Sequence, residues 1–378
     1  MLTRAHGGFN DLLSAAAVDE LVSMRGLRTP FVRMAKDGRV LDRAKFTRSG
    51  GAGASINDQV ADDHVLALLG DGATLVLQAL HRTWPPLVAF GAALSGELGH
   101  PVQINAYITP PQNQGFAPHY DVHDVFVLQV SGRKNWTIHE PVVTDPLDNQ
   151  PWENYRHDVG ERAQQQPLID TVIEPGDALY LPRGTIHSAQ ALGETSIHLT
   201  VGIHPITRYH LVRQLIDAAQ DDPALRVSLP AGVDLSDPAV LAPHLTATIE
   251  ALQLRIAASE VEPAAASLVD TLRRQTRPEP LSPLAQLEVA AVLDHDTELR
   301  LRTGMHPQLQ HDADGITVHL LDRTLSFAAD AAEALKTVFD GGAFTPADLP
   351  GLDAAQQLAA VQRLLRAGVV VPVSTFLA

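Results

Sequence analysis

Cysteine is absent from this chain of 378 residues. Disulfide bonds, thiolate zinc sites, iron–sulfur clusters and cysteine nucleophiles are therefore excluded, and any bound metal must be held by nitrogen and oxygen atoms. No apolar run approaches the roughly 20 residues that a membrane-spanning helix needs. The N-terminal residues also lead into no apolar segment of the kind found in secretory signals, so we expect a soluble cytoplasmic protein.

Basic side chains are scarce as well, with 28 Lys and Arg against 44 Asp and Glu, for a net charge of −16. Such a surface repels phosphate backbones and anionic lipids, so neither nucleic acid nor membrane is an expected partner. A basic protein would be attracted instead. The hydrophobic share of 45% is ordinary for a globular protein, and the length suggests two or three domains.

The predicted secondary structure changes near residue 100, from helices to strands. Before it, apolar residues at helical spacing predict helices over 11–24, 58–69 and 87–98. After it, short β-rich runs separated by turn residues predict strands over 102–108, 122–130, 134–139, 168–173, 178–181 and 196–203. The pair Ser131-Gly132 predicts a tight hairpin turn, and 174–177 a second turn. Many short strands with such turns indicate a small β-barrel or sandwich.

The remainder of the chain is predicted to be helical and then mixed. Residues 208–277 are rich in Ala and Leu at helical spacing, and the proline-rich stretch 278–283 is typical of a linker. In 286–378, a strand over 315–321, helices over 329–339 and 354–367 and a strand over 369–373 suggest a winged-helix domain. This part carries 6 basic and 12 acidic residues, which favours protein contacts over DNA binding.

The main chemical signal is Pro118-His119-Tyr120-Asp121. In extended backbone, His119 and Asp121 point to the same face, and His187, after a later turn, is the obvious third ligand. Two histidines and one carboxylate form the facial triad of oxygen-activating iron(II) enzymes. A His-x-Asp triplet is common by chance, however, and His123 is an alternative ligand because it continues the same strand face.

A cation near this triad would complete a site for 2-oxoglutarate. That cosubstrate can occupy two of the open positions on iron and leave one for O₂, while its distant carboxylate needs a positive partner. Lys134 lies on the strand that the Ser131-Gly132 hairpin would pair, and we expect it to point into the barrel. The alternative is an ordinary solvated lysine. Residues 145–166, rich in Asp, Glu, Asn and Gln, could contact a basic substrate, although a solvated surface loop is the simpler reading.

Residues 105–111, 118–121, 124–136 and 174–189 together resemble the ribosomal oxygenase branch of the JmjC proteins, often called cupin-4. The resemblance implies a mixed α and β fold with a JmjC double-stranded β-helix (cupin) barrel. It also implies a helical dimerisation region and a C-terminal winged-helix domain. The expected domains are then a catalytic domain with an N-terminal helical elaboration over 1–206, the dimerisation region over 207–280 and the winged helix over 286–378.

The same resemblance implies roles for individual residues. It assigns the iron ligands to His119, Asp121 and His187, as the sequence pattern does. It assigns cosubstrate binding to Lys134 and Asn105 and places Tyr107 in the substrate channel. Two departures concern the substrate: Lys134 is nearer to the histidyl hydroxylases than to the bacterial arginine hydroxylase, which has arginine there, and Gly202 stands where some members carry serine.

The expected function is an iron(II)- and 2-oxoglutarate-dependent oxygenase that uses O₂ to hydroxylate a protein side chain. By resemblance, the target is an arginine or histidine of a basic ribosomal protein, and the enzyme is a homodimer. Two alternatives have the same metal ligands: a peptide-tailoring hydroxylase of a biosynthetic pathway, and a metal-binding cupin that serves as a sensor or scaffold without catalysis. Lys134 discriminates against the last, which needs no cation near the triad.

Overall fold

The computed structural model describes residues 1–4, 7–53, 55–313 and 315–373. The chain divides into two compact units, Met1–Pro205 and Ile206–Ala378, and each is described by itself. Among the described residues, no helix is both long enough and apolar enough to cross a membrane.

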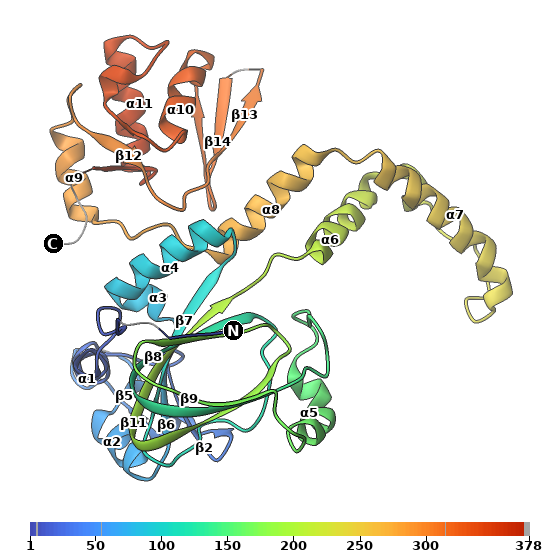
Figure 1. Ribbon diagram of the computed structural model, residues 1–378. Coiled ribbons are helices and arrows are strands. Elements are labelled where there is room, and N and C mark those ends of the chain that lie inside the picture. Colours follow the sequence, from blue (N-terminus) through green and yellow to red (C-terminus); the bar gives the residue numbers. More distant parts are fainter. Residues whose placement is uncertain (5–6, 54, 314, 374–378) are drawn as a thin grey trace. The chain divides into compact units, whose positions relative to one another are not determined.

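The first unit is built around one antiparallel sheet whose long strands curl around a common interior (Figure 1). Its strand order is β1-β10-β8-β11-β7-β6-β2-β3, and β9 pairs with β8 off this path. The strands are β1 (Leu2–Arg4), β2 (Val32–Lys36), β3 (Arg39–Val40), β6 (Thr74–Leu77), β7 (Val102–Thr109), β8 (Asp124–His139), β9 (Ile169–Ile173), β10 (Asp177–Leu181) and β11 (Ile186–Ile203). This is the arrangement of a cupin-type barrel, as the sequence predicted.

Strands β8 and β11 are each continuous, which corrects one prediction. Ser131-Gly132 is not a hairpin turn: β8 runs through it for 16 residues. The pairing with β11 shifts there, since Arg133 pairs with Leu192 whereas Ser131 pairs with Ile197. Gly132 has φ +65°, and a Cβ atom on it would lie 2.3 Å from the Thr195 carbonyl oxygen. A glycine at positive φ suits a β-bulge as well as a turn, so the residue type alone misled the prediction.

Helices cover one face of the sheet and close the main core. They are α1 (Ala15–Met24), α2 (Asp62–Gly70), α3 (Leu80–Thr83) and α4 (Pro85–Leu98), and the small strands β4 (Thr47–Arg48) and β5 (Gln59–Val60) lie between α1 and α2 in sequence. The Ser14 hydroxyl caps α1 by accepting from the Ala17 amide, and α4 begins at Pro85, which needs no amide partner there. The predicted helices are thus present, with later starts for α1 and α2.

The alternation of side chains along β7 separates this core from the barrel interior. Ile104, Ala106 and Ile108 are buried in the core that the helices cover. Tyr107 and Thr109, on the opposite face of the strand, line a cavity inside the barrel. A second apolar cluster, containing Val127, Trp136 and Ile173 among others, belongs to the barrel strands themselves. Because side chains alternate along β7, one face of the strand packs in the core and the other lines the partly polar cavity.

Residues 145–166 differ from the expected loop. They contain a 3₁₀ turn, η2 (Trp152–Tyr155), and a short helix, α5 (Arg156–Arg162). Val159 of α5 is buried and packs in one cluster with Tyr120 and Ile186, next to the candidate site. An apolar residue buried at this point explains why a segment of largely polar composition folds into a helix.

The second unit contains helices and two small sheets. Its helices are α6 (Arg208–Ala218), α7 (Pro238–Ala257), α8 (Val261–Gln275), α9 (Pro283–Ala291), α10 (Ala332–Phe339) and α11 (Ala354–Arg366). One sheet has the order β16-β12-β17, from β12 (Leu299–Leu301), β16 (Ala343–Phe344) and β17 (Val370–Pro372). The other has the order β13-β14-β15, from β13 (Gln308–Asp312), β14 (Gly315–His319) and β15 (Thr324–Phe327). Residues 314 and 374–378 of the predicted C-terminal domain lie outside the described residues.

Candidate metal centre and cavity

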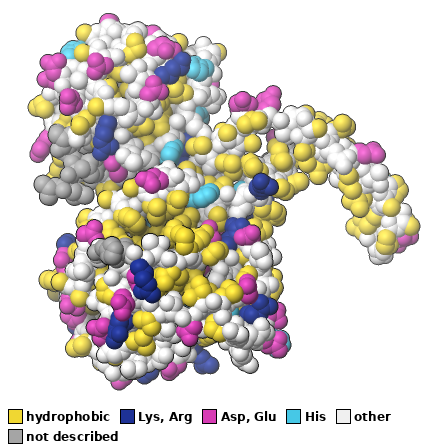
Figure 2. Space-filling view, in the orientation of Figure 1, with side chains coloured by type: hydrophobic (Ala, Val, Ile, Leu, Met, Phe, Trp, Pro, Cys, Tyr) yellow, Lys and Arg dark blue, Asp and Glu magenta, His cyan; other side chains and the backbone are white. Residues whose placement is uncertain are grey.

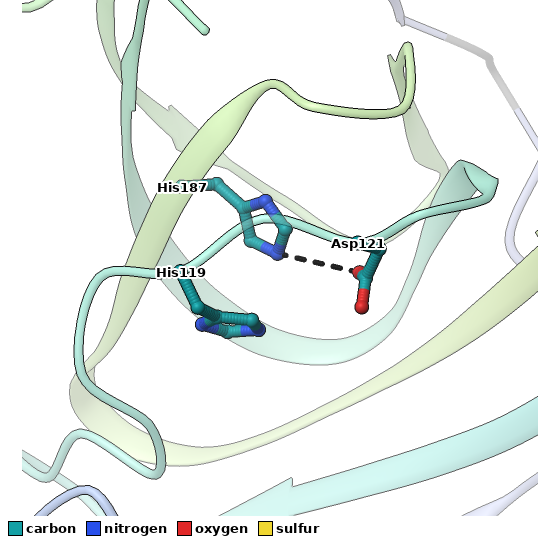
Figure 3. Close-up of side chains that lie close together, drawn as sticks. All are labelled: His119, Asp121 and His187. Atoms are coloured by element: carbon teal, nitrogen blue, oxygen red, sulfur yellow. Dashed lines mark ion pairs between the residues drawn. The ribbon is translucent and has the colours of Figure 1, made fainter. Parts of the chain in front are cut away.

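Three predicted ligands converge in the first unit. His119, Asp121 and His187 each offer one ligand atom, and these atoms all lie within 4.8 Å of one another. The His187 Nε2 atom is 3.7 Å from the Asp121 Oδ2 atom, and the two imidazole centroids are 4.5 Å apart. Figure 3 shows the three side chains directed toward a common point. The closely spaced His119 and Asp121 and the distant His187 therefore lie in one cluster.

Backbone pairing brings the two histidines together. The His119 amide donates to the His187 carbonyl at 3.2 Å, and the His187 amide donates back at 2.8 Å, forming an antiparallel bridge. Farther along, the Gly184 amide donates to the Asp121 carbonyl at 2.9 Å. The segment that precedes β8 therefore lies alongside the start of β11, and residues 119 and 121 fall on one side of it.

Each imidazole is held so that one nitrogen faces the cluster. The Nδ1 atom of His119 lies 2.8 Å from the Ala117 carbonyl, and that of His187 lies 3.0 Å from the Thr185 carbonyl. A carbonyl oxygen can only accept, so Nδ1 carries the proton and Nε2 keeps its lone pair. This arrangement prepares a histidine to bind a metal through Nε2.

The charge states also suit metal binding. Burial, reinforced by the neighbouring His119, lowers the pKa of His187 to about 4, so this imidazole is neutral at neutral pH. Burial alone would raise the pKa of Asp121, but the nearby histidines, His187 foremost, outweigh it and lower that pKa. The cluster therefore presents the Asp121 carboxylate and a neutral His187 imidazole.

The cluster opens into a cavity of about 320 Å³, a size suited to a small organic ligand. Its lining comes from several strands and loops of the first unit. Besides the three ligands, it includes Arg33, Gly38, Val40, Thr74, Tyr107, Thr109, Gly115, Phe116, Ala117, Val125, Val127, Lys134, Trp136, Trp152, Glu153, Ser188, Ala189, His198 and Thr200.

Lys134 is buried in this cavity, which rules out the solvated alternative. Only 3% of the residue is exposed. Its Nζ atom donates to the Thr109 hydroxyl at 3.0 Å and lies 3.3 Å from the His198 Nδ1 atom. Burial lowers the pKa of Lys134 to about 7. Among the described residues no carboxylate forms an ion pair with it. An amine in such a place calls for an anion.

Tyr107 lines the cavity, and its predicted place in a substrate channel stays a prediction. Its ring stacks on His198 with centroids 5.0 Å apart and meets Phe116 edge-on at 6.0 Å. Burial, with the Asp121 carboxylate adding to it, raises the pKa of Tyr107 to about 12. The residue is therefore a neutral phenol that can donate a hydrogen bond to a ligand.

Two other candidates lie outside the cavity lining. The Asn105 side-chain oxygen accepts from the Ala79 amide at 3.0 Å and from Gln103 at 3.5 Å. Its role in cosubstrate binding therefore stays a prediction without a contact to support it. His123, the alternative metal ligand, stacks on His204 at 4.7 Å and is not part of the three-residue cluster.

Several lining residues were missed by sequence reasoning. Thr109 and Trp136 each lie two residues beyond a predicted site residue on the same strand, so strand periodicity offered a signal for both. Arg33 on β2 and the pair Trp152 and Glu153 come from elements that carried no predicted site residue. No sequence pattern connects Arg33 to the cavity. Trp152 and Glu153 belong to residues 145–166, for which contact with a basic substrate was the less favoured interpretation.

Comparisons with known proteins agree with this geometry. A family model described as JmjC domain matches residues 92–211. Ribosomal oxygenase 1 of Bos taurus is 35% identical over 199 residues, covering 52% of this chain and 28% of that protein. Bifunctional lysine-specific demethylase and histidyl-hydroxylase NO66 of Drosophila erecta is 41% identical over 137 residues, covering 34% of this chain and 20% of that protein. The chain thus spans less than a third of the length of these two relatives.

Solved structures give a likeness over nearly the whole chain. A structure of Escherichia coli YcfD, a ribosomal oxygenase, in complex with cobalt and succinic acid has a TM-score of 0.51 at 19% identity, covering 95% of this chain and 90% of that chain. An X-ray structure of E. coli YcfD gives 0.55 at 19% identity, covering 98% and 94%. At this identity the likeness shows a shared fold alone. Residues 92–211 therefore match the JmjC domain by sequence, and this part of the chain is similar to ribosomal oxygenase 1 and to NO66.

Proposed function

We propose that this chain is an iron(II)- and 2-oxoglutarate-dependent oxygenase that hydroxylates a protein side chain. One observation carries the proposal above the others. A single cavity contains a cluster of two histidines and an aspartate together with Lys134, a buried lysine that has no carboxylate partner among the described residues. A structural metal site needs no such lysine, whereas an anionic cosubstrate does.

The donor set fits iron(II). His119 and His187 present Nε2 lone pairs because their Nδ1 protons are engaged by backbone carbonyls, and Asp121 supplies the carboxylate. Two imidazoles and one carboxylate hold iron(II) while leaving positions for other ligands. Bound iron would supply the activation of O₂ that attack on an unactivated carbon requires. The protein's own part is to hold the ligands, orient the cosubstrate and limit access of water.

The cosubstrate would be oriented by the other part of the cavity. Lys134, once charged, and the Thr109 hydroxyl can both donate to the distant carboxylate of 2-oxoglutarate. Trp136 lies between the two parts, with its ring 5.9 Å from His187 and 5.5 Å from His198. The E. coli YcfD complex with cobalt and succinic acid supports this pairing of a divalent metal with a dicarboxylate.

The substrate is proposed to be a side chain of a ribosomal protein, an arginine or a histidine, of which the cavity favours histidine. Arg33 lines the cavity with its guanidinium carbon 6.0 Å from the Phe116 ring centroid, and its buried Nε atom has no hydrogen-bond partner. The Arg33 cation repels an incoming guanidinium and can donate to a neutral imidazole, whereas the Glu153 carboxylate of the same lining attracts a cation. The net charge of −16 suits a basic protein substrate and disfavours nucleic acid.

The second unit is proposed to contain the dimerisation region over 207–280 and a winged-helix domain over 286–378. Figure 2 shows hydrophobic side chains along the helices α6 to α8. The 20-residue helix α7 has no buried residue, and Leu245 and Ile249 are 61% and 45% exposed. An apolar helix left uncovered is typical of a subunit interface. We expect Leu245→Glu with Ile249→Glu to halve the mass by light scattering; an unchanged mass would contradict the homodimer. A cytoplasmic location stays a prediction.

Succinate release and substrate mass together test the proposed activity. The full chain is incubated with iron(II), 2-oxoglutarate and ribosomal proteins, with His187→Ala as the inactive control. We expect succinate and a gain of one oxygen on a histidine-containing peptide only with the unaltered chain. No succinate under any condition would favour the non-catalytic cupin. Succinate without a modified ribosomal protein, but with a modified short peptide, would favour the peptide-tailoring alternative.

A further inference from the structure

Two of the three proposed ligands lie on a connection and not within a strand. The chain between β7 and β8 carries His119 and Asp121, and it bends at Val122 and His123 just before β8 begins. His119 is fixed by its backbone bridge to His187. The Asp121 carboxylate, by contrast, accepts no hydrogen bond from the described residues, and the His187 Nε2 atom lies 3.7 Å from it, too far for one. Its position therefore depends on the path of the backbone on either side.

The His123 side chain occupies a slot over Gly202 of β11. An ideal Cβ atom built on Gly202 of β11 would lie 2.6 Å from the His123 Cδ2 atom and 2.7 Å from its Nε2 atom. Real Cβ atoms do not approach other atoms so closely, so the imidazole occupies space that exists only because residue 202 is glycine. Gly202 is not at a positive φ, and therefore its backbone conformation does not require glycine. The close approach of His123 is the reason that remains.

A second contact holds the imidazole in this slot. The rings of His123 and His204 stack with centroids 4.7 Å apart and an interplanar angle of 18°. His204 is itself fixed, because its Nε2 atom lies 3.2 Å from the Gln103 side-chain oxygen and its amide donates to the Pro101 carbonyl at 2.9 Å. The end of β11 and the start of β7 thus form a rigid seat for a side chain two residues beyond Asp121.

We propose that His123 is a positioning residue. Its imidazole lies in the slot over Gly202 and anchors the bend that follows Asp121, which directs the Asp121 carboxylate toward His119 and His187. The inference rests on the proposed function, in which Asp121 is a metal ligand. It assigns His123 no bond to the metal. Residue 121 lies between the bridge at residue 119 and the seated imidazole at residue 123, and the Gly184 amide holds its carbonyl oxygen. Loosening the imidazole lets the carboxylate swing away without unfolding the barrel.

The test compares metal binding by four variants of the full chain. They are Gly202→Ala, His123→Ala, the double variant, and Gly96→Ala as a matched control, since a Cβ atom at Gly96 in α4 would meet nothing within 4 Å. Cobalt(II) is the probe, because its affinity is measured by calorimetry and its visible absorption reports the ligand geometry. Thermal unfolding without metal reports the fold separately.

We expect Gly202→Ala and His123→Ala each to weaken cobalt binding about tenfold or more, the size seen for residues that orient metal ligands. The double variant should bind no worse than His123→Ala, because the added methyl then has no imidazole to displace. Gly96→Ala should bind as the unaltered chain does. If Gly202→Ala fails to fold, His123→Ala with its altered cobalt spectrum still carries the test.

Three results would overturn the inference. Unaltered affinity and spectrum in both single variants would show that the slot does not position Asp121. Multiplied losses in the double variant would show that the two residues act separately. Lower melting temperatures with unaltered cobalt affinity would show a purely structural contact. A different failure, in which the unaltered chain binds no cobalt, would refute the proposed metal site itself.

Discussion

The two parts of the cavity are opposite in charge. Among the described residues, the metal cluster is negative and lacks a cation, whereas the region around Lys134 is positive and lacks an anion. Around the metal cluster, the Asp121 carboxylate provides negative charge beside His187, an imidazole that is neutral at neutral pH. Around Lys134, a buried amine beside Thr109 and His198 provides positive charge without an anion. A buried unpaired charge destabilises a folded protein, so the burial of Lys134 is not explained by stability. Together the two parts match a metal ion and an organic anion bound side by side.

Removing a ligand from the metal cluster should have the largest effect. We expect His187→Ala or Asp121→Ala to reduce succinate formation to background, because a two-ligand site no longer holds iron(II) firmly. The bridge to His119 uses backbone atoms, so the fold should persist by circular dichroism and thermal unfolding. If both variants kept substantial turnover, these residues would not be the ligands.

Removing the cation should affect the other part alone. We expect Lys134→Ala to raise the KM for 2-oxoglutarate about 10- to 100-fold, since a charge-assisted hydrogen bond contributes roughly 1.5–3 kcal/mol. Cobalt(II) affinity without the cosubstrate should stay unaltered, because Lys134 contacts none of the three proposed metal ligands. Equal losses of both would show that the two parts are not independent, and an unaltered KM would remove Lys134 from the cosubstrate site.

Binding of 2-oxoglutarate should depend on pH through Lys134. Burial lowers the pKa of this amine to about 7, so in the empty cavity it is charged mainly below that pH. Above it, an anion binds only with uptake of a proton, and Kd should rise by up to about tenfold per pH unit. Calorimetry from about pH 6 to 9 measures this rise. Lys134→Arg, always charged, should flatten it; equal slopes in both proteins would contradict the assignment.

Replacing Arg33 should have the smallest effect of these substitutions. We expect Arg33→Gln to reduce the preference for a histidine peptide over the matched arginine peptide by about three- to tenfold in kcat/KM, because the repelling cation is gone. Succinate formation without peptide should not change. A preference that stays the same would mean that Arg33 does not select the side chain.

Much of the site followed from residue chemistry and strand geometry. Without cysteine, a metal had to bind nitrogen and oxygen, and the spacing of His119 and Asp121 placed both on one side of an extended segment. His187 was identified as the third ligand, and the structure brings it into the cluster. Arg33 could not be found in this way, because nothing in a single sequence connects β2 to the cavity.

Lys134 shows where sequence reasoning reached a correct position by a wrong route. The hairpin predicted at Ser131-Gly132 does not exist, and in a regular strand Lys134 would face away from Val125 and Val127, which are an odd number of residues earlier. All three nevertheless line the cavity. The pairing places one extra residue of β8 between Gln129 and Ser131, which shifts the alternation and turns Lys134 inward.

The sequence by itself determined the kinds of atoms that can bind metal, and it indicated the strand-rich barrel segment and the candidate ligands His119, Asp121 and His187. Only the tertiary structure decided which side chains share the cavity and that Lys134 is buried there without a carboxylate partner among the described residues. The physical reason is that strand periodicity is local, whereas a bulge depends on the partner strand. The phase of β8 is set by β11, more than fifty residues farther along the chain.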